Sequence, residues 1–141
     1  MDRDFPLGGR LFSARLRQML DNLQRPGPSE EGGAWSPAVD IVETPQAVVI
    51  VAELAGVRRE DIKVLVDGEV VRIYGRREPS LHQPGARYHR LEIESGDFVR
   101  SFRIGVPFDP QGVEATTSMG LLKITLPKRE ASRRKIDVEA V

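Results

Sequence analysis

Apolar and polar residues alternate through the middle of this chain in the manner of β-strands. IKVLV at residues 62–66 has the period of two that places alternate side chains on one face. VVIV at residues 48–51 is a continuous β-branched run, typical of a strand that is buried on both sides or lies in a sandwich core. Phe98, Arg100, Phe102, Ile104 and Val106 share one face of a further predicted strand.

Turn residues separate these predicted strands at short intervals. Asp67-Gly68 stands between residues 62–66 and 70–74 and predicts a hairpin. Met119-Gly120 lies between the last predicted pair, residues 113–117 and 121–126. Closely spaced strands without a long helical pattern favour an all-β fold, an immunoglobulin-like antiparallel β-sandwich over residues 35–128.

The segments on either side of the sandwich have a different pattern. Residues 1–34 are interpreted as an N-terminal arm, with a short amphipathic helix over residues 10–24 that ends at Arg25-Pro26. Residues 129–141 are mostly polar and cannot bury enough apolar surface to fold alone, which predicts a flexible C-terminal tail.

A long polar stretch separates the predicted strands between Gly75 and Gly96. A connection of this length inside a compact domain is usually functional or mobile. Only residues 88–92 within it have the composition of a short strand. His82 and His89 are seven residues apart and could bind a metal or sense pH, but solvated loop residues are the preferred interpretation.

Composition narrows the function classes. The 141 residues suffice for one domain, and 21 basic residues balance 21 acidic ones, so no overall charge points to nucleic acid or a membrane surface. The absence of cysteine excludes disulfides and thiol chemistry. Neither a signal peptide nor a run of about 20 apolar residues is found, which predicts a cytoplasmic protein. Without phosphate-binding, nucleophile or metalloprotease motifs, we expect no enzyme, cofactor or metal.

Four segments in order carry a family resemblance: WSPAVDIVET at residues 35–44, AELAGV at 52–57, GDFVRSF at 96–102 and GLLKITLPK at 120–128. Together they resemble the α-crystallin domain of the small heat-shock proteins, Hsp20-like chaperones of the bacterial and plant type. Two positions depart from the family pattern. Ala55 replaces the usual proline before Gly56, and Met119 replaces the usual Asn or Asp before Gly120.

The resemblance implies a stress-response holdase that binds non-native client proteins without ATP. It also implies a homodimer, in which a strand of the long loop pairs with the edge of the partner's sandwich, and larger homo-oligomers. The expected interface residues are Trp35, Tyr88, His89, Arg90, Leu91 and Arg100. The alternative is a co-chaperone-like adaptor with the same fold that recognises a single partner.

Arg100 is unusual because it lies on the apolar face of its predicted strand. A buried arginine needs a carboxylate or several carbonyl groups as partners. An edge position, where the guanidinium reaches water, is the alternative. The resemblance favours an ion pair at the dimer interface.

Ile136 and Val138 form a second candidate site in the tail. In an extended segment these two side chains point the same way. A chance pair in a disordered tail is the alternative, but the resemblance implies an Ile/Val-x-Ile/Val motif that docks in a groove on a neighbouring subunit. The groove would lie between residues 62–66 and 113–117, and its expected residues are Val64, Val66, Ala115 and Thr117.

The apolar residues of the arm are the candidate client-binding surface. They include methionine and phenylalanine, which suit unspecific partners. Packing of this face on the chain's own sandwich or on its dimer mate is the alternative. The residues are Phe5, Leu11, Phe12, Leu16, Met19 and Leu20.

Overall fold

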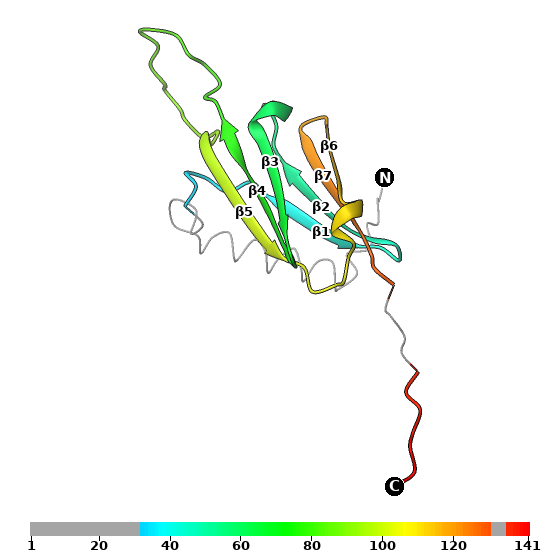
Figure 1. Cartoon of the computed structure of the whole chain (residues 1–141). Coiled ribbons are helices and arrows are strands. Elements are labelled where there is room, and N and C mark those ends of the chain that lie inside the picture. Colours follow the sequence, from blue (N-terminus) through cyan, green and yellow to red (C-terminus); the bar gives the residue numbers. More distant parts are fainter. Residues whose placement is uncertain (1–31, 131–134) are drawn as a thin grey trace, which may run out of the picture.

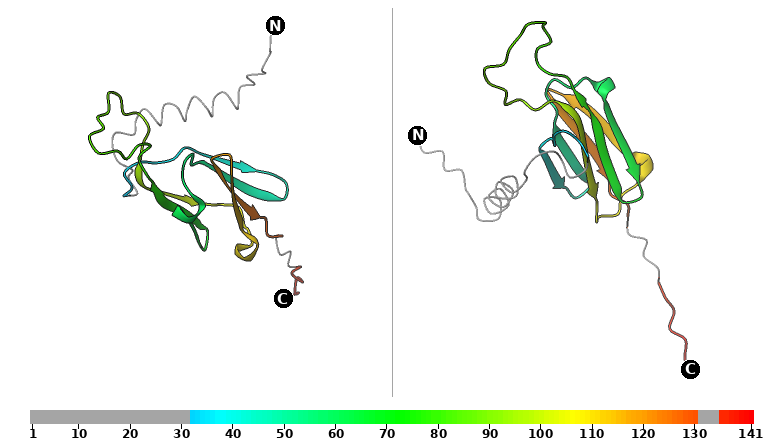
Figure 2. Two further views of the ribbon diagram at one scale, coloured as in Figure 1. Left: turned by 90° about the horizontal axis from the view of Figure 1, so that it is seen from above. Right: turned by 90° about the vertical axis from the view of Figure 1, so that its left-hand side faces the viewer.

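The computed structural model describes residues 32–130 and 135–141, and the first of these ranges forms a β-sandwich (Figure 1). The two antiparallel sheets face each other as two layers (Figure 2). One sheet has the order β1-β2-β7-β6 and the other the order β3-β4-β5. The all-β sandwich predicted from the alternation is therefore confirmed. The bounds are β1 Val39–Glu43, β2 Ala47–Glu53, β3 Ile62–Asp67, β4 Val70–Arg77, β5 Gly96–Arg103, β6 Glu114–Ser118 and β7 Leu121–Pro127, with 3-10 helices η1 Arg59–Asp61 and η2 Pro110–Gly112.

The alternating side chains of the strands fill the space between the two sheets. In β2, Val48 and Ile50 are buried, whereas Val49 and Val51 are half-buried on the outer face. The β-branched run is thus a strand of the sandwich core, flanked by β1 and β7. The buried core cluster consists of Trp35, Val48, Ile50, Ala52, Leu54, Val71, Ile73, Phe98, Ile104, Phe108, Leu122, Ile124 and Leu126.

The hairpin between β3 and β4 is where the sequence predicts it, but its turn is shifted by one residue. Asp67 pairs with Val70, so the two turn residues are Gly68 and Glu69 rather than Asp67 and Gly68. Gly68 has a φ of 58°, in the left-handed region that glycine adopts without a steric penalty.

The hairpin between β6 and β7 has a methionine, Met119, at a turn position with a left-handed backbone conformation. Ser118 pairs with Leu121, and the two turn residues, Met119 and Gly120, have φ values of 52° and 79°. Positive φ at both central residues is the geometry that favours Asn-Gly. The unusual methionine therefore lies where an asparagine would fit better.

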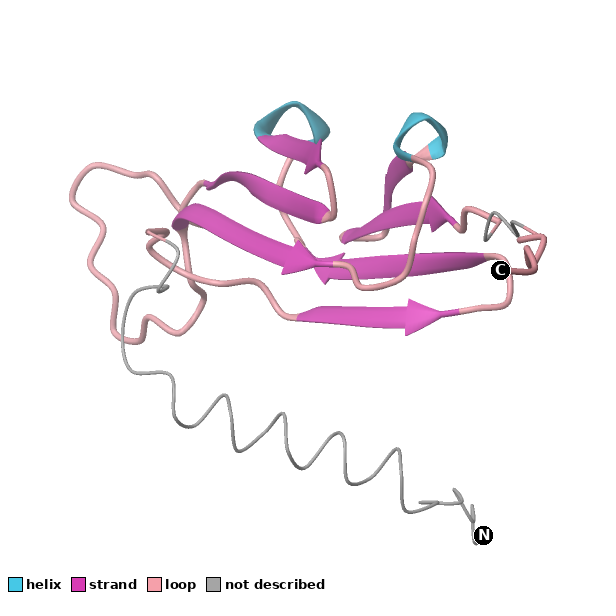
Figure 3. Cartoon of the chain, turned by 60° about the horizontal axis from the view of Figure 1, so that its bottom comes forward, coloured by secondary structure: helices cyan, strands magenta, loops and turns pink. Residues whose placement is uncertain are grey.

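Two expectations for the region around β5 are changed by the structure. β5 ends at Arg103, and Ile104 is buried beyond the strand, where its amide donates to the carbonyl of Glu69 at 2.8 Å. Residues 78–95 contain no strand, including the predicted short strand at 88–92, and they form a long loop that projects from one end of the sandwich (Figure 3).

Candidate binding surfaces

Along the side of the sandwich where β3 and β6 lie, the inward-facing side chains are not fully covered. β3 and β6 are edge strands of their sheets, and Figure 1 shows them on the same side of the sandwich. Ala115 pairs with Ile124 and Thr117 with Leu122. Paired residues share a face of the sheet, and both partners in β7 are buried in the core. Ala115 and Thr117 therefore point towards the interior, yet both are exposed.

The β3 side of this edge is apolar. Val64 and Val66 are half-buried and pack against the core cluster. We call Val64, Val66, Ala115 and Thr117 the open edge. These are the residues that the family resemblance assigned to a groove, and the structure places them on the two facing edge strands.

The tail carries apolar side chains that the rest of the described chain does not cover. Ile136 is 76% exposed and Val138 is 95% exposed. Residues 135–141 form neither helix nor strand. Docking of this motif on another subunit stays a prediction.

The long loop also presents large apolar side chains to solvent. Tyr88 and Leu91, both predicted as interface residues, are exposed together with His89 and Arg90. Leu81 and Ile93 are exposed as well, and the sequence pattern did not single out these two. The spacing of Leu91 and Ile93 at i and i+2 was the signal that could have identified Ile93.

Strand β1 is the other edge strand of the four-stranded sheet, opposite β6. It pairs only with β2 in the described chain, and Ile41 and Val42 are 48% and 49% exposed. Ile41 pairs with Ile50, which is buried, so its side chain lies on the interior face and is still half uncovered. An exposed strand edge with apolar side chains is a site where another strand can add.

Arg100 lies on the interior face of β5 and is half-buried. Its guanidinium donates to the carbonyl of Pro37 at 2.9 Å and lies 5.0 Å from the ring centroid of Phe102. A carbonyl group is one of the partners that a buried arginine requires. The ion pair across a dimer interface stays a prediction.

Trp35, one of the expected interface residues, packs inside its own sandwich. Its side chain is 4% exposed and lies in the core of its own sandwich, 5.3 Å from the ring of Phe98 in an edge-to-face arrangement. Little of the indole is left to contact a partner. Trp35 precedes the first predicted strand and has no periodic context, so the sequence did not indicate this burial.

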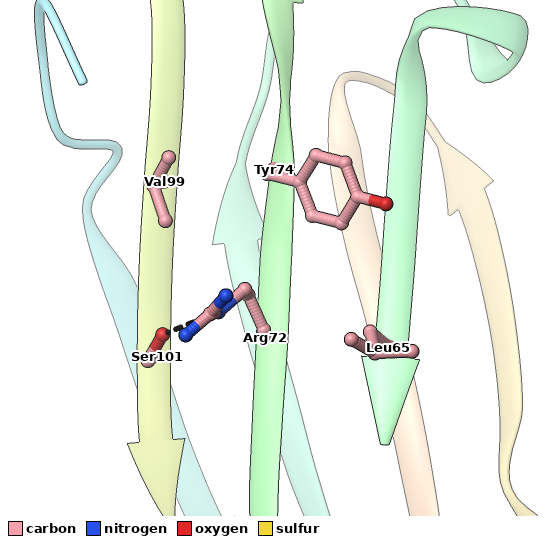
Figure 4. Close-up of a pocket in the computed structure, with 5 residues that line it drawn as sticks. All are labelled: Leu65, Arg72, Tyr74, Val99 and Ser101. Carbon is pink, nitrogen blue, oxygen red and sulfur yellow. Dashed lines mark hydrogen bonds between the residues drawn. The ribbon is translucent and has the colours of Figure 1, made fainter. Parts of the chain in front are cut away.

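A shallow hollow of about 500 Å³ lies on the outer face of the three-stranded sheet (Figure 4). Leu65, Tyr74 and Val99 supply its apolar lining. Arg72 crosses from β4 and donates through Nε to the hydroxyl of Ser101 at 3.2 Å. These five lining residues form no catalytic grouping.

The remaining predicted residues are exposed or lie outside the described residues. His82 is exposed, and its imidazole is 3.7 Å from the carboxylate of Glu78. The six arm residues from Phe5 to Leu20 lie outside the described residues. Across residues 32–130 and 135–141, no helix is both long enough and apolar enough to cross a membrane.

Comparison with known proteins identifies the family. Residues 40–139 match the model of the Hsp20/alpha crystallin family. An 18.1 kDa class I heat shock protein of Oryza sativa subsp. japonica is 37% identical over 117 residues, which span 82% of this chain and 71% of that protein. An 18.5 kDa class I heat shock protein of Glycine max is 35% identical over 141 residues, which span 99% and 81% of the two chains.

Solved structures agree with the sequence relatives. The hspA structure from Xanthomonas axonopodis has a TM-score of 0.64 at 34% identity and covers 70% of this chain and 98% of its own. A small heat-shock protein from Xylella fastidiosa has a TM-score of 0.65 at 36% identity and covers 75% and 98%. Small heat-shock proteins are chaperones of the stress response that work without ATP and form homo-oligomers; they are not enzymes. By its matched domain, its relatives and its fold, this chain belongs to the Hsp20/alpha crystallin family.

Proposed function

We propose that this protein is a cytoplasmic holdase, which binds apolar segments of unfolding proteins and slows their aggregation until other chaperones refold them. Binding to the unfolded state of a client shifts the client's equilibrium by mass action, so this activity requires no nucleotide. Apolar residues of the arm, residues 1–34, would contact clients. The sandwich, residues 35–128, and the tail, residues 129–141, would hold the assembly together.

The observation that carries the proposal is the apolar surface left uncovered on four parts of the described chain. Side chains of the long loop, of β1 and of the tail are exposed in the single subunit, and the open edge is only partly covered. Exposed apolar patches on a folded domain mark surfaces that bind other protein. Self-assembly would cover them at rest, and loosening of the assembly under stress would uncover the client-binding residues.

The loop and β1 are complementary parts of a dimer. β1 has one unpaired edge in the described chain, and residues 88–91 of the loop are exposed and carry apolar side chains. An extended segment from the partner would supply the missing ladder hydrogen bonds and cover Ile41 and Val42. Loop exchange between two sandwiches is therefore the proposed dimer contact.

The tail would link dimers by docking on the open edge of a neighbouring subunit. Ile136 lies nine positions after Pro127 in the sequence, so the motif reaches up to about 30 Å from the sandwich. Burial of Ile136 and Val138 contributes at most about 3–6 kcal/mol. Ordering of the tail opposes much of this gain. Single docking events would be weak, and several together would hold an oligomer that exchanges subunits.

Deletion of residues 1–24 tests the assignment of the client-binding surface. We expect the truncated protein to keep its β circular dichroism spectrum and to lose most of its suppression of client aggregation on heating. The variant carrying Ile136→Ala and Val138→Ala is the matched control, because it retains the arm and is expected to form smaller assemblies by light scattering. Full protection by the truncated protein would rule out the arm as the client site.

A further inference from the structure

The root of the long loop is built around one arginine and the single tryptophan of the chain. Arg77 is the last residue of β4, and it pairs with Gly96, the first residue of β5. The loop, residues 78–95, leaves and returns at this pair. Any group that holds these ends therefore sets the direction in which the loop projects.

Arg77 contacts three segments that are distant in sequence. Its Nε donates to the carbonyl of Glu94 at 2.8 Å, and this residue belongs to the returning end of the loop. One terminal nitrogen donates to the carbonyl of Ala55 at 3.3 Å, in the connection between β2 and β3. The guanidinium carbon lies 3.9 Å from the centroid of the Trp35 ring. Stacking of this kind contributes about 0.5–2 kcal/mol, with the larger value for desolvated pairs.

Trp35 connects the same root to the point where the arm joins the sandwich. Its indole Nε1 donates to the carbonyl of Gly96 at 2.9 Å. The amide of Ala34 donates to the carbonyl of Asp97 at 2.8 Å. Gly33 is buried beside β5, where a Cβ atom would lie 3.0 Å from the amide nitrogen of Val99. Residues 33–35, where the arm meets the sandwich, are thus held against the start of β5.

We propose that Arg77 is the positioning residue of the long loop and acts through Trp35 and the carbonyl of Glu94. It keeps the returning end of the loop and the attachment point of the arm in one fixed arrangement. The inference rests on the proposed function in one respect: the loop is taken as the element that exchanges between subunits. Loss of Arg77 would then loosen the loop root first and weaken the dimer as a consequence.

The neighbouring arginines of β4 lack this set of contacts. Arg76 is exposed and bonds the carboxylates of Glu78 and Asp97 at 3.0 and 3.3 Å, and these hydrogen bonds raise its pKa. Exposed ion pairs of this kind contribute little to stability. Arg72 faces outward and donates to a β5 hydroxyl away from the root. Arg77, which is half-buried, binds two carbonyl groups and an aromatic ring.

The test compares Arg77→Ala and Arg77→Lys with Arg72→Ala in the full chain. Hydrogen exchange measures the amides of residues 33–36 and 93–97. Tryptophan fluorescence, excited selectively over the two tyrosines, reports on Trp35 alone because it is the single tryptophan. For Arg77→Ala we expect about tenfold faster exchange at both segments, a red-shifted emission and a dimer dissociation constant raised about tenfold. Lysine retains the cation but not the planar fork of donors, so Arg77→Lys is expected to fall between. Arg72→Ala should match the unmodified protein.

Two results would overturn the inference. If hydrogen exchange at the loop root and the tryptophan emission are unchanged in Arg77→Ala, the root does not depend on this side chain. Equal acceleration in β2 and β7 would show a general loss of stability rather than a local role. If Arg77→Ala does not fold, Arg77→Lys decides by the same two readouts. A protein that is monomeric at every concentration would instead refute the loop-exchange dimer, and the exchange and fluorescence results would still decide the role of Arg77.

Discussion

The turn at Met119 allows a direct test of the backbone geometry. Met119 has a φ of 52° and is 98% exposed, so its side chain contributes no packing that a substitution could remove. A left-handed conformation costs an ordinary L-residue about 1–2 kcal/mol, whereas asparagine tolerates it. Met119→Asn should recover part of this cost, about 0.5–1 kcal/mol. For a domain of this size the gain corresponds to a melting temperature higher by about 2–8 °C.

Thermal unfolding followed by circular dichroism measures this effect. All variants are compared at one protein concentration, because assembly also shifts the apparent stability. Met119→Ala is the control, since alanine keeps the left-handed strain and removes the same exposed side chain; its stability should lie within about 0.5 kcal/mol of the unmodified protein. Equal stability of the asparagine and alanine variants would refute the assignment of a strained turn.

Two further substitutions test the packing and the open edge. A Cβ atom at Gly75 would collide with the backbone carbonyl oxygen of Asp61, so Gly75→Ala should lower the free energy of unfolding by about 1–3 kcal/mol in urea titrations. Gly105→Ala is the control and should be tolerated, because no atom lies within 4 Å of the added Cβ. Equal losses of stability at both sites would contradict the close approach of Asp61 to Gly75. Ala115→Arg places a charge in the open edge and should reduce oligomer mass by light scattering, whereas Thr116→Arg, on the outer face of the same strand, should not. Equal masses for these two variants would argue against docking at this edge.

The strands of the sandwich could be predicted because their pattern is local. The alternation of residues 62–66 and the β-branched run at 48–51 each indicate a strand without knowledge of its neighbours. Ala115 and Thr117 lie on the edge strand β6, and their role in a docking groove stays a prediction. The turn after Asp67 was misplaced by one residue, because register depends on the whole ladder rather than on the dipeptide.

Other features depend on contacts between distant segments and left no local signal. The burial of Trp35 follows from its hydrogen bond to Gly96 and its packing on Phe98, both far along the chain. The three contacts of Arg77 likewise join segments that the sequence keeps apart. A strand at residues 88–92 needs a neighbouring strand for its ladder, and the described part of the single chain supplies none there.

The most direct test of the holdase proposal heats several unrelated client proteins with and without the purified protein, in the absence of ATP. Turbidity follows client aggregation, and light scattering reports the size of the chaperone in the same samples. We expect suppression of aggregation for each client at a near-stoichiometric ratio, with a change in assembly size on heating. A folded sample that protects none of these clients would contradict the proposal and would favour an adaptor for a single partner.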